Sequence, residues 1–510
     1  MYNRITPISR YLIRTVPALR TMTSAATTKE IIIIGGGIIG CSTAYYLTRH
    51  PSYSPEIHRI TLLEAASTST GGRTADSIQD PATLADPATA SRKNPAHDGI
   101  AGGASGKAGG LLALWAFPQN IVPLSFRLHE ELAREHGGEK RWGYRRCWAS
   151  EVDCKARLPT SQQQQQTQKD SGAADGDDGG GEQGQEKKKK KDEGLHKDHK
   201  KDPATLRKLG APEDLDWVDA ARSLNAYDNI GTPENTAQVH PELFTRSMAQ
   251  LAEDAGVRIV TGARATRINR RSGSDNTRVE SVTYEKDGEE ITQTATDCVV
   301  AAGPWTRRLL PEIPVAASRA HSVVIKPSRA ISAYALFTAI KLPAGFRTPA
   351  GQTAKTSRSS TGSGGGDNNK GNSAYVPLRA PQIVNPEIYA RPDGTAYACG
   401  PTDEVIPLPL TTAEVEVDEA RCDDVVAQVG GISDELGRDG EVLARQACYL
   451  PQGGPYIGQV GNTKGLVVAA GHTCWGIQNA PGTGKLVSEI VFDGKAKSAR
   501  LGGCDPALVL

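Results

Sequence analysis

The sequence predicts an α/β fold, because it opens with a strand, a glycine-rich turn and a helix. Residues 31–34 are four consecutive isoleucines, an apolar run that is typical of a buried parallel strand. A Gly-x-Gly-x-x-Gly pattern follows at once, with its glycines at Gly35, Gly37 and Gly40. After a helical stretch, residues 60–63 form a second short apolar strand. This order of elements predicts a Rossmann-like domain that binds a dinucleotide.

Each part of this motif has a physical role in nucleotide binding. The glycines permit a tight turn, a close approach of backbone to a pyrophosphate, and close packing of helix on strand. The helix N-terminus would bind the phosphates through its free N–H groups and its dipole. Glu64 ends the second strand and can accept hydrogen bonds from ribose hydroxyls. A glycine-rich turn without a ligand is the alternative, but it leaves Glu64 unexplained.

Composition excludes several other classes of protein. A chain of 510 residues is long enough for two to four domains. The 59 Lys and Arg residues balance the 58 Asp and Glu residues, which argues against a nucleic-acid partner or an anionic membrane surface. We find no apolar run of the roughly 18 residues that a membrane span needs. The nine cysteines include no C-x-x-C pair, so we expect a reducing compartment, no disulfide framework and no metal site.

The N-terminal segment has an unusual charge pattern. Residues 1–29 contain four arginines, one lysine and no acid, with apolar residues among the arginines. This pattern resembles a mitochondrial presequence, and a disordered tail is the alternative. We therefore expect an intracellular protein, with the cytoplasm favoured and mitochondrial import as the alternative.

Three segments lack the apolar residues needed to form a core. They are residues 66–99, 158–204 and 351–373, which are rich in Ser, Gly, Gln, Asp or Lys. Such composition cannot offset the entropy lost on ordering, so we expect three disordered insertions whose partners are unknown.

The last part of the chain repeats the strand–glycine–helix pattern. Residues 298–301 and 466–470 are apolar strands, and each runs into a glycine turn, at Gly303 and at Gly471. A glycine-rich run, residues 100–113, lets backbone approach a flat ring closely because few side chains intervene. A nucleotide site assembled from both ends of the chain is typical of two-domain flavoproteins, so we expect FAD rather than NAD.

The motifs in their order resemble one family. The stretches GGGIIG, LLEA, GGASGKAGGLLA, VVAAGPW and AAGHTCWGIQNAPGTGK resemble the D-amino-acid-oxidase-like FAD oxidoreductases, which include glycine oxidase and sarcosine oxidase. Within that family, the chain is most similar to a fungal branch.

The resemblance also implies a division into domains. It implies an FAD-binding domain of discontinuous segments and an interposed α+β substrate domain with a mainly antiparallel sheet. The FAD-binding segments are residues 30–65, 100–157, 234–308 and 440–500. The substrate domain comprises residues 309–439, with part of 205–233.

The resemblance assigns FAD contacts along the whole chain. The glycine turn and Glu64 would bind the nucleotide, and Ala265 would meet the adenine. The residues beside the isoalloxazine would be Ser105, Gly106, Gly109, Gly110 and Leu111. The residues of the last glycine turn would be Gly471, His472, Gly476, Ile477 and Gln478, with Gly303 in the turn before. His472 would bind the pyrophosphate or ribityl chain, or be a buried structural histidine.

The activity that the resemblance implies is oxidation of a C–N bond. Hydride would pass from carbon to flavin N5, and molecular oxygen would then be reduced to peroxide. The substrate would be a small-molecule amine or imino acid. The alternative is a flavin-bound protein of weak or no turnover that acts as a regulatory or trafficking component.

The sequence departs from the amino-acid oxidases where they bind carboxylate. Leu450 and Gln478 stand where family members carry a cationic anchor. Either Arg319, Arg391 or Arg445 replaces that anchor, or the substrate is not a simple amino acid. Gln478 and Arg319 are therefore catalytic-site candidates.

Two further side chains have competing interpretations. Lys107 would place a positive charge near flavin N5 and favour oxygen reduction, or it is a solvent-facing lysine. Cys448 aligns with the cysteine that attaches FAD covalently in sarcosine oxidase-like proteins. The alternative for Cys448 is a buried, inert thiol.

Overall fold

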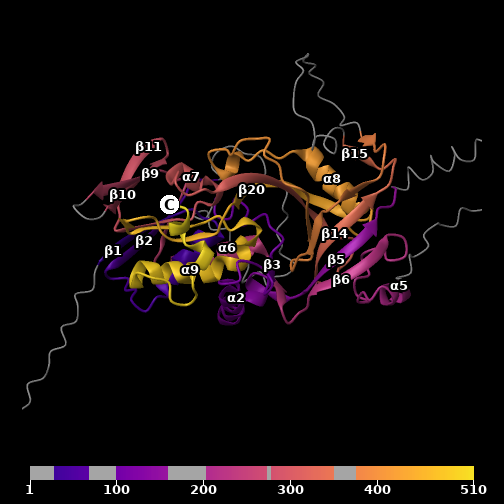
Figure 1. Cartoon of the computed structure of the whole chain (residues 1–510), viewed down its shortest axis with the longest axis horizontal. Coiled ribbons are helices and arrows are strands. Elements are labelled where there is room, and N and C mark those ends of the chain that lie inside the picture. The colour runs from indigo at the N-terminus through magenta and orange to yellow at the C-terminus, as the bar shows by residue number, and fades with distance from the viewer. Residues whose placement is uncertain (1–27, 68–98, 159–202, 273–276, 350–374) are drawn as a thin grey trace, which may run out of the picture.

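The computed structural model describes residues 28–67, 99–158, 203–272, 277–349 and 375–510 (Figure 1). The presequence-like segment and nearly all of the three expected insertions lie outside the described residues. The described chain forms two large sheets that lie side by side along the long axis, as the mixed α/β prediction requires (Figure 1).

The first sheet has six strands, in the order β21-β23-β12-β1-β2-β8. Five neighbouring strands of this order are parallel to one another: β23, β12, β1, β2 and β8. Only β21 is antiparallel to its neighbour. The bounds are β1 (Lys29–Ile34), β2 (His58–Glu64), β8 (Arg258–Thr261), β12 (Asp297–Val300), β21 (Tyr456–Gln459) and β23 (Leu466–Ala470).

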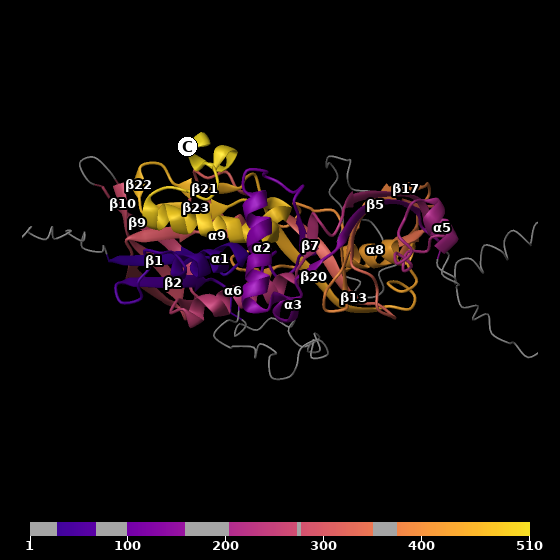
Figure 2. The same cartoon turned by 90° about the horizontal axis from the view of Figure 1, so that it is seen from below.

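The four isoleucines of β1 serve the two faces of this sheet alternately. Ile31 and Ile33 pack against helices, whereas Ile32 and Ile34 pack against a second layer of strands. The helices are α1 (Ile38–Thr48), α2 (Val122–His136), α6 (Pro241–Asp254) and α9 (Gly476–Asp493), with the short α3 (Gly138–Arg141) beside them (Figure 2). The strand layer consists of β9 (Arg264–Ser272), β10 (Thr277–Lys286), β11 (Glu289–Thr294) and β22 (Thr463–Lys464).

The second sheet has eight strands and is mainly antiparallel. Its order is β20-β13-β19-β18-β14-β5-β6, and β17 pairs with β14 off this path. The bounds are β5 (Trp148–Lys155), β6 (Leu224–Gly231), β13 (Ala316–Lys326), β14 (Tyr334–Leu342), β17 (Gln382–Val384), β18 (Glu387–Ala390), β19 (Ala396–Cys399) and β20 (Glu441–Gln452). Helix α8 (Glu419–Gly430) packs on one face with the apolar cluster that includes Val323, Leu336 and Ile388.

Two strands change the expected domain boundaries. Strands β5 and β20 fall in segments expected in the FAD-binding domain, but both lie in the second sheet. The reason is strand pairing: β20 pairs with β13 from Ala316 to Lys326, and β5 pairs with β14 along its whole length. The strands β3 (Leu111–Ala113), β4 (Arg145–Arg146) and β7 (Thr236–Gln238) form a small sheet of their own.

The remaining elements are short. They are α5 (Pro203–Lys208), the hairpin of β15 (Arg347–Pro349) with β16 (Tyr375–Pro377), and the short helix α7 (Thr306–Leu309) after β12. Within the described ranges, no helix is long and apolar enough to cross a membrane.

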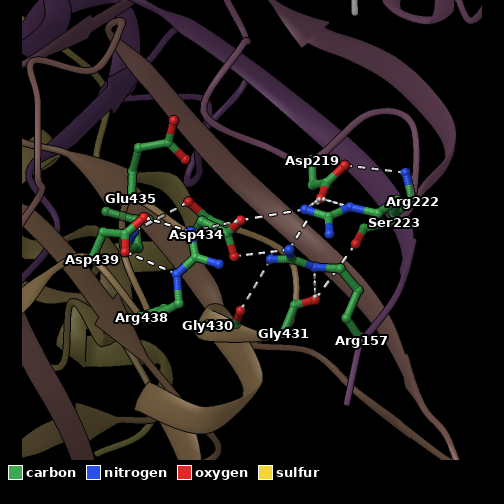
Figure 3. A network of polar contacts seen from close by, with 12 residues as sticks. Arg157, Asp219, Arg222, Ser223, Gly430, Gly431, Asp434, Glu435, Arg438 and Asp439 are labelled. Carbon is green, nitrogen blue, oxygen red and sulfur yellow. Dashed lines mark hydrogen bonds and ion pairs between the residues drawn. The ribbon is translucent and has the colours of Figure 1, made fainter. Parts of the chain in front are cut away.

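An ion-pair network ties down both flanks of the expected 158–204 insertion (Figure 3). Arg157 precedes that segment and Asp219 follows it, and they pair at 3.1 Å. Both are joined to the chain after α8, because Arg157 also pairs with Asp434 at 2.8 Å and donates to the Gly431 carbonyl at 3.1 Å. Arg157, which directly precedes the expected insertion, is therefore held against Asp219 and the chain after α8.

Candidate cofactor cavity and active site

A cavity of about 330 Å³ lies at the carboxyl ends of the parallel strands, where α/β sheets bind ligands. Strands β1, β2, β12 and β23 all end at its wall. The residues that line it are 34–35, 37–39, 63–65, 102–105, 108, 263–266, 301–305, 308–309, 410–412, 449–451, 469–474 and 476–477.

In the first turn, Gly35 and Gly40 pack tightly against backbone, whereas Gly37 faces the cavity. A Cβ at Gly35 would lie 2.4 Å from the Ala301 carbonyl oxygen, and one at Gly40 would lie 1.9 Å from the Gly35 carbonyl oxygen. A Cβ at Gly37 would meet only the Ser105 hydroxyl, at 3.1 Å, and would otherwise enter the cavity. Gly37 is thus the position at which a side chain would compete with a ligand.

Glu64 is fixed at the end of β2 by two backbone donors. Its Oε2 accepts from the Gly36 N–H at 2.7 Å, and its Oε1 accepts from the Ala66 N–H at 2.8 Å. Burial raises the pKa of Glu64, and these N–H groups oppose that rise. The carboxylate lines the cavity beside the glycine turn, so ribose hydroxyls can donate to its remaining lone pairs.

Of the residues expected beside the isoalloxazine, only Ser105 of the 100–110 loop lines the cavity. The others pack against protein. The Ser105 hydroxyl accepts from the Ile38 N–H at 2.9 Å and so caps α1 from outside the helix. A Cβ at Gly106, Gly109 or Gly110 would lie within 2.5 Å of the Ala101 carbonyl, the Tyr389 ring or the Val239 carbonyl, respectively. These three glycines do not line the cavity, and neither does Leu111, which packs in the cluster around Tyr389. The three glycines therefore allow close packing of the loop against other parts of the protein and do not approach a ligand.

The last glycine turn places the N-terminus of α9 at the cavity wall. Gly471 and His472 line it, as do Gly476 and Ile477 in the first turn of the helix. Gln478 points away from the cavity, because its Oε1 accepts from the Ala113 N–H at 2.8 Å. Since no side chain caps the start of α9, its N–H groups and positive dipole end face the cavity.

Two buried histidines hold this turn and stay neutral. His472 Nε2 lies 3.0 Å from the Thr483 hydroxyl, and His129 Nε2 donates to the Ile477 carbonyl at 3.0 Å. Burial lowers the pKa of His472 to about 3 and that of His129 to about 4. His472 is therefore satisfied by protein, which favours the structural interpretation.

These histidines should make folding stability fall in acid. Below the ordinary pKa of 6.5, the unfolded chain binds protons that the folded chain does not. Each histidine then lowers the free energy of unfolding by about 2 kcal/mol at pH 5, so the thermal midpoint should drop between pH 7 and pH 5. Replacing both by glutamine should remove much of this drop. An unchanged pH dependence in the double variant would contradict the assignment.

None of the expected cationic candidates lines the cavity. Lys107 is half-buried and donates to the Ala447 carbonyl at 3.0 Å, and Arg391 is buried and donates to the Ala108 carbonyl at 2.6 Å. Arg445 pairs with Asp423 at 2.7 Å at the surface. Burial lowers the pKa of Lys107. Lys107 is not the solvent-facing lysine of the alternative interpretation.

Arg319 lies in a buried ion pair. Its guanidinium contacts the Asp403 carboxylate at 3.3 Å and donates to the Glu416 carbonyl at 3.2 Å. His321 also faces Asp403, at 3.6 Å. Arg319 thus joins β13 to the 403–418 segment, and its donors are already used there.

Cys448 is buried and absent from the cavity wall, although its neighbours Tyr449, Leu450 and Pro451 line it. Burial raises the pKa of its thiol to about 11, even though Lys107 opposes the rise. Little thiolate is available at neutral pH, which favours the interpretation of an inert thiol.

The 403–418 segment is a part of the site that sequence motifs did not indicate. Leu410, Thr411 and Thr412 line the cavity. Trp305 Nε1 donates to the Pro409 carbonyl at 2.7 Å, and the Tyr449 hydroxyl donates to the Ile406 carbonyl at 2.8 Å. These partners are more than 40 residues apart along the chain, so no local pattern could reveal the contact.

The turn before α9, which lines the cavity, also packs against aromatic residues that lie outside the cavity wall. Trp475 contacts Trp115 with ring centroids 5.6 Å apart, and Trp115 contacts Phe337 of β14 at 6.2 Å. Phe337 in turn contacts Tyr389 of β18 at 6.3 Å. Glu387 lies at the start of β18 and accepts a hydrogen bond from the Tyr389 hydroxyl. We call these four rings and Glu387 the aromatic–acid surface.

The chain matches a family model described as "FAD dependent oxidoreductase" over residues 30–85 and 96–490. It is 31% identical to TDA3 of Saccharomyces cerevisiae, which is named as a candidate oxidoreductase, and the match covers 94% of each chain. A second candidate oxidoreductase, from Schizosaccharomyces pombe, is 28% identical, with 94% of this chain and 98% of the relative covered.

Solved structures share the fold at low sequence identity. Glycine oxidase from Geobacillus kaustophilus superposes with a TM-score of 0.54 and 16% identity, covering 94% of this chain and 98% of that one. L-Amino acid deaminase from Proteus vulgaris superposes with a TM-score of 0.53 and 14% identity, covering 94% and 97%. Iminodiacetate oxidase from Chelativorans has a TM-score of 0.52 and 16% identity, covering 93% and 98%.

Proposed function

The chain belongs to the FAD-dependent oxidoreductase family known as DAO, and we propose that it oxidises a C–N bond of an amine or imino acid with molecular oxygen as acceptor. The names of its structural neighbours support this reaction class, since glycine, L-amino acids and iminodiacetate all carry a C–N bond. The observation that carries the proposal is the position of Trp475, which lies between the cavity-lining residues Cys474 and Gly476 while its ring packs on Trp115 of the aromatic–acid surface.

The residues present fit FAD, the cofactor of this family. Gly37 leaves open space where a side chain would enter the cavity, as close approach of a pyrophosphate requires. Glu64 presents a buried carboxylate beside that turn, and the N-termini of α1 and α9 both point to the cavity. When bound, FAD supplies two-electron chemistry, taking a hydride from the carbon that bears nitrogen and passing the electrons to oxygen to give peroxide.

The protein's own groups would set the geometry and the charge for this chemistry. The N–H groups and dipole of α9 would stabilise negative charge at their end of the cavity. Lys107 would contribute a half-buried positive charge from the 100–110 loop. Leu410, Thr411 and Thr412 would cover the cofactor and keep water away. Oxidation of a neutral amine needs no strong base. His129 and His472, the two buried histidines that contact the α9 turn, are both neutral.

Anaerobic titration tests the proposal most directly. The yellow purified protein would be mixed under argon with a panel of primary, secondary and amino-acid amines, and flavin absorbance would be recorded. We expect at least one amine to bleach the flavin, with one peroxide formed per flavin when air is admitted. If dithionite bleaches the flavin and no amine does, the protein is a flavin-bound component without turnover.

The geometry of Cys448 gives a separate prediction about attachment. We expect acid precipitation to leave a colourless pellet and to release FAD, because the thiol is protonated and outside the cavity wall. Cys448→Ala should keep a normal flavin content and an unchanged absorption spectrum. A pellet that stays yellow in the parent protein and turns colourless in Cys448→Ala would instead establish a thioether at this position.

A further inference from the structure

We propose that the aromatic–acid surface binds the positively charged group of the substrate, with Glu387 as its counter-ion. This inference rests on the proposed amine oxidase function and names a substrate class for it. The substrate would be an organic compound with a cationic ammonium group and without a carboxylate next to the reacting carbon. The nitrogen that is oxidised would be a separate, neutral amine.

The register of the second sheet places Glu387 on the face that looks toward the cofactor domain. Glu387 pairs with Phe337 across β18 and β14, and Tyr389 pairs with Ala335 two positions along. Paired residues and alternate residues of a strand share one face of a sheet. Tyr389 packs on Gly109 of the cofactor-domain loop, so this face points to that loop. The opposite face packs on α8 through Ile388 and Leu336.

Glu387 is close to the turn that lines the cofactor cavity. Cys474 belongs to the cavity wall and sits in that turn. Burial raises the pKa of the Cys474 thiol, and the nearby Glu387 carboxylate adds to the rise. The carboxylate is thus within electrostatic reach of the same turn that carries the α9 N-terminus.

The Glu387 carboxylate has neutral partners only, within the part of the chain that the structure describes. It accepts from the Tyr389 hydroxyl and from the Cys399 thiol, whose sulfur lies 4.0 Å away. No lysine, arginine or histidine of the described residues pairs with it. Burial raises the pKa of Glu387, and the Tyr389 hydrogen bond opposes the rise. A half-buried carboxylate without a counter-ion is costly, and a bound cation would relieve that cost.

The rings beside Glu387 suit an ammonium group. Phe337, Trp115 and Trp475 are all partly exposed, so their faces and edges are open to a ligand. Aromatic faces attract organic cations through the ring quadrupole, and a carboxylate adds the stronger ionic term. A carboxylate-bearing substrate would be repelled here.

Among the described residues, the arginines that line the cavity already have protein partners. Leu450 lines it with an aliphatic side chain. Among the described residues that line the cavity, the basic ones are Arg264 and Arg308. Arg264 pairs with Glu285, and Arg308 donates to the Leu408 carbonyl at 2.7 Å. The charge distribution therefore favours a cation over an amino acid.

Cation binding should depend on pH through Glu387 itself. The groups that face it are Tyr389 on its own strand, Cys399 on β19 and Cys474 on the turn, and the pKa of each is raised, so all three stay neutral below pH 8. The exposed Glu151 lies in the same row on β5 and adds negative charge. Because the pKa of Glu387 is raised, affinity should fall as the pH falls through it toward 4.5.

Binding of tetramethylammonium tests the proposal without turnover. This probe has no titratable proton, and it is compared with tert-butanol and pivalate, which have a similar branched shape but carry no charge or a negative charge. Binding is followed in the FAD-loaded protein by flavin absorbance and tryptophan fluorescence. We expect tetramethylammonium to bind at least tenfold more tightly than either comparison compound, and more weakly at pH 5 than at pH 7.

Glu387→Gln should weaken tetramethylammonium binding at least tenfold and remove its pH dependence. Glu387→Asp, which keeps the charge, should restore part of the affinity. The control is Glu441→Gln, an exposed glutamate at the far end of the same sheet, which should bind the probe as the parent does. All three variants should retain FAD.

The outcomes separate this inference from the proposed function. Pivalate binding as tight as that of tetramethylammonium, or equal tetramethylammonium affinity in Glu387→Gln and the parent, would overturn the inference. If an amine still bleached the flavin in that case, the oxidase function would stand. Cation binding that requires Glu387, together with no bleaching by any amine, would support the site and contradict the oxidase function.

Discussion

Gly37→Val is expected to give a folded protein that binds no FAD. A Cβ at this position meets only the Ser105 hydroxyl, at 3.1 Å, so the turn itself tolerates the change. The branched side chain would, however, occupy the space in which the pyrophosphate must approach the backbone. We expect a colourless protein with less than a tenth of the parent flavin content and a native circular dichroism spectrum.

Two further glycine variants serve as controls for this result. In Gly40→Val, the Cβ would lie 1.9 Å from the Gly35 carbonyl oxygen, so we expect α1 to lose its packing on β1 and the protein to misfold. Gly503→Val places a side chain in open space away from the cavity and should stay folded and yellow. Full flavin occupancy in Gly37→Val would mean that the nucleotide site has been misassigned.

Arg319→Leu is expected to lower stability by about 3–5 kcal/mol, because it leaves Asp403 charged and buried without its main partner. The substitution should also loosen the 403–418 segment, whose residues 410–412 line the cavity, so flavin content should fall too. The measurements are the thermal midpoint and the ratio of flavin to protein. A substrate-binding role would instead raise KM and leave both values unchanged.

A matched variant tests whether the loss of stability comes from the burial of the ion pair or only from the loss of a positive charge. Arg445→Leu removes an ion pair with Asp423 at the surface, where the arginine side chain is 38% exposed, and should cost less than about 1 kcal/mol. The double variant Arg319→Leu/Asp403→Leu should recover much of the lost stability, since both buried charges are then absent. Equal midpoints for Arg319→Leu and Arg445→Leu would contradict the structural role of Arg319.

The sequence alone was sufficient for features that depend on short stretches of chain. The strand 31–34, the turn through Gly37, the acid Glu64 and the turn at Gly471 lie where local pattern predicted them. A strand followed by a glycine turn and a helix has one common three-dimensional arrangement, so the pattern carries the geometry with it. The fold class and the FAD cofactor followed from the order of these stretches.

Only the tertiary structure decided which side chains face the cavity and which face protein. Gly109 and Gln478 sit within the right motifs, yet one packs under Tyr389 and the other holds the Ala113 N–H. Cys448 faces away from the cavity although the next three residues line it. A shift of one position in a strand reverses the face on which a side chain lies, and that position is set by the partner strand.

The same reason explains the residues that sequence motifs missed. Arg319 contacts Asp403, and Glu387 lies opposite Phe337, through pairings between segments that are distant along the chain. The fate of a charge depends on its burial and on its partners, which a linear pattern does not contain. The sequence determined the nucleotide fold and its cofactor, whereas the register of the second sheet determined that Glu387 lies on the face toward the cofactor domain.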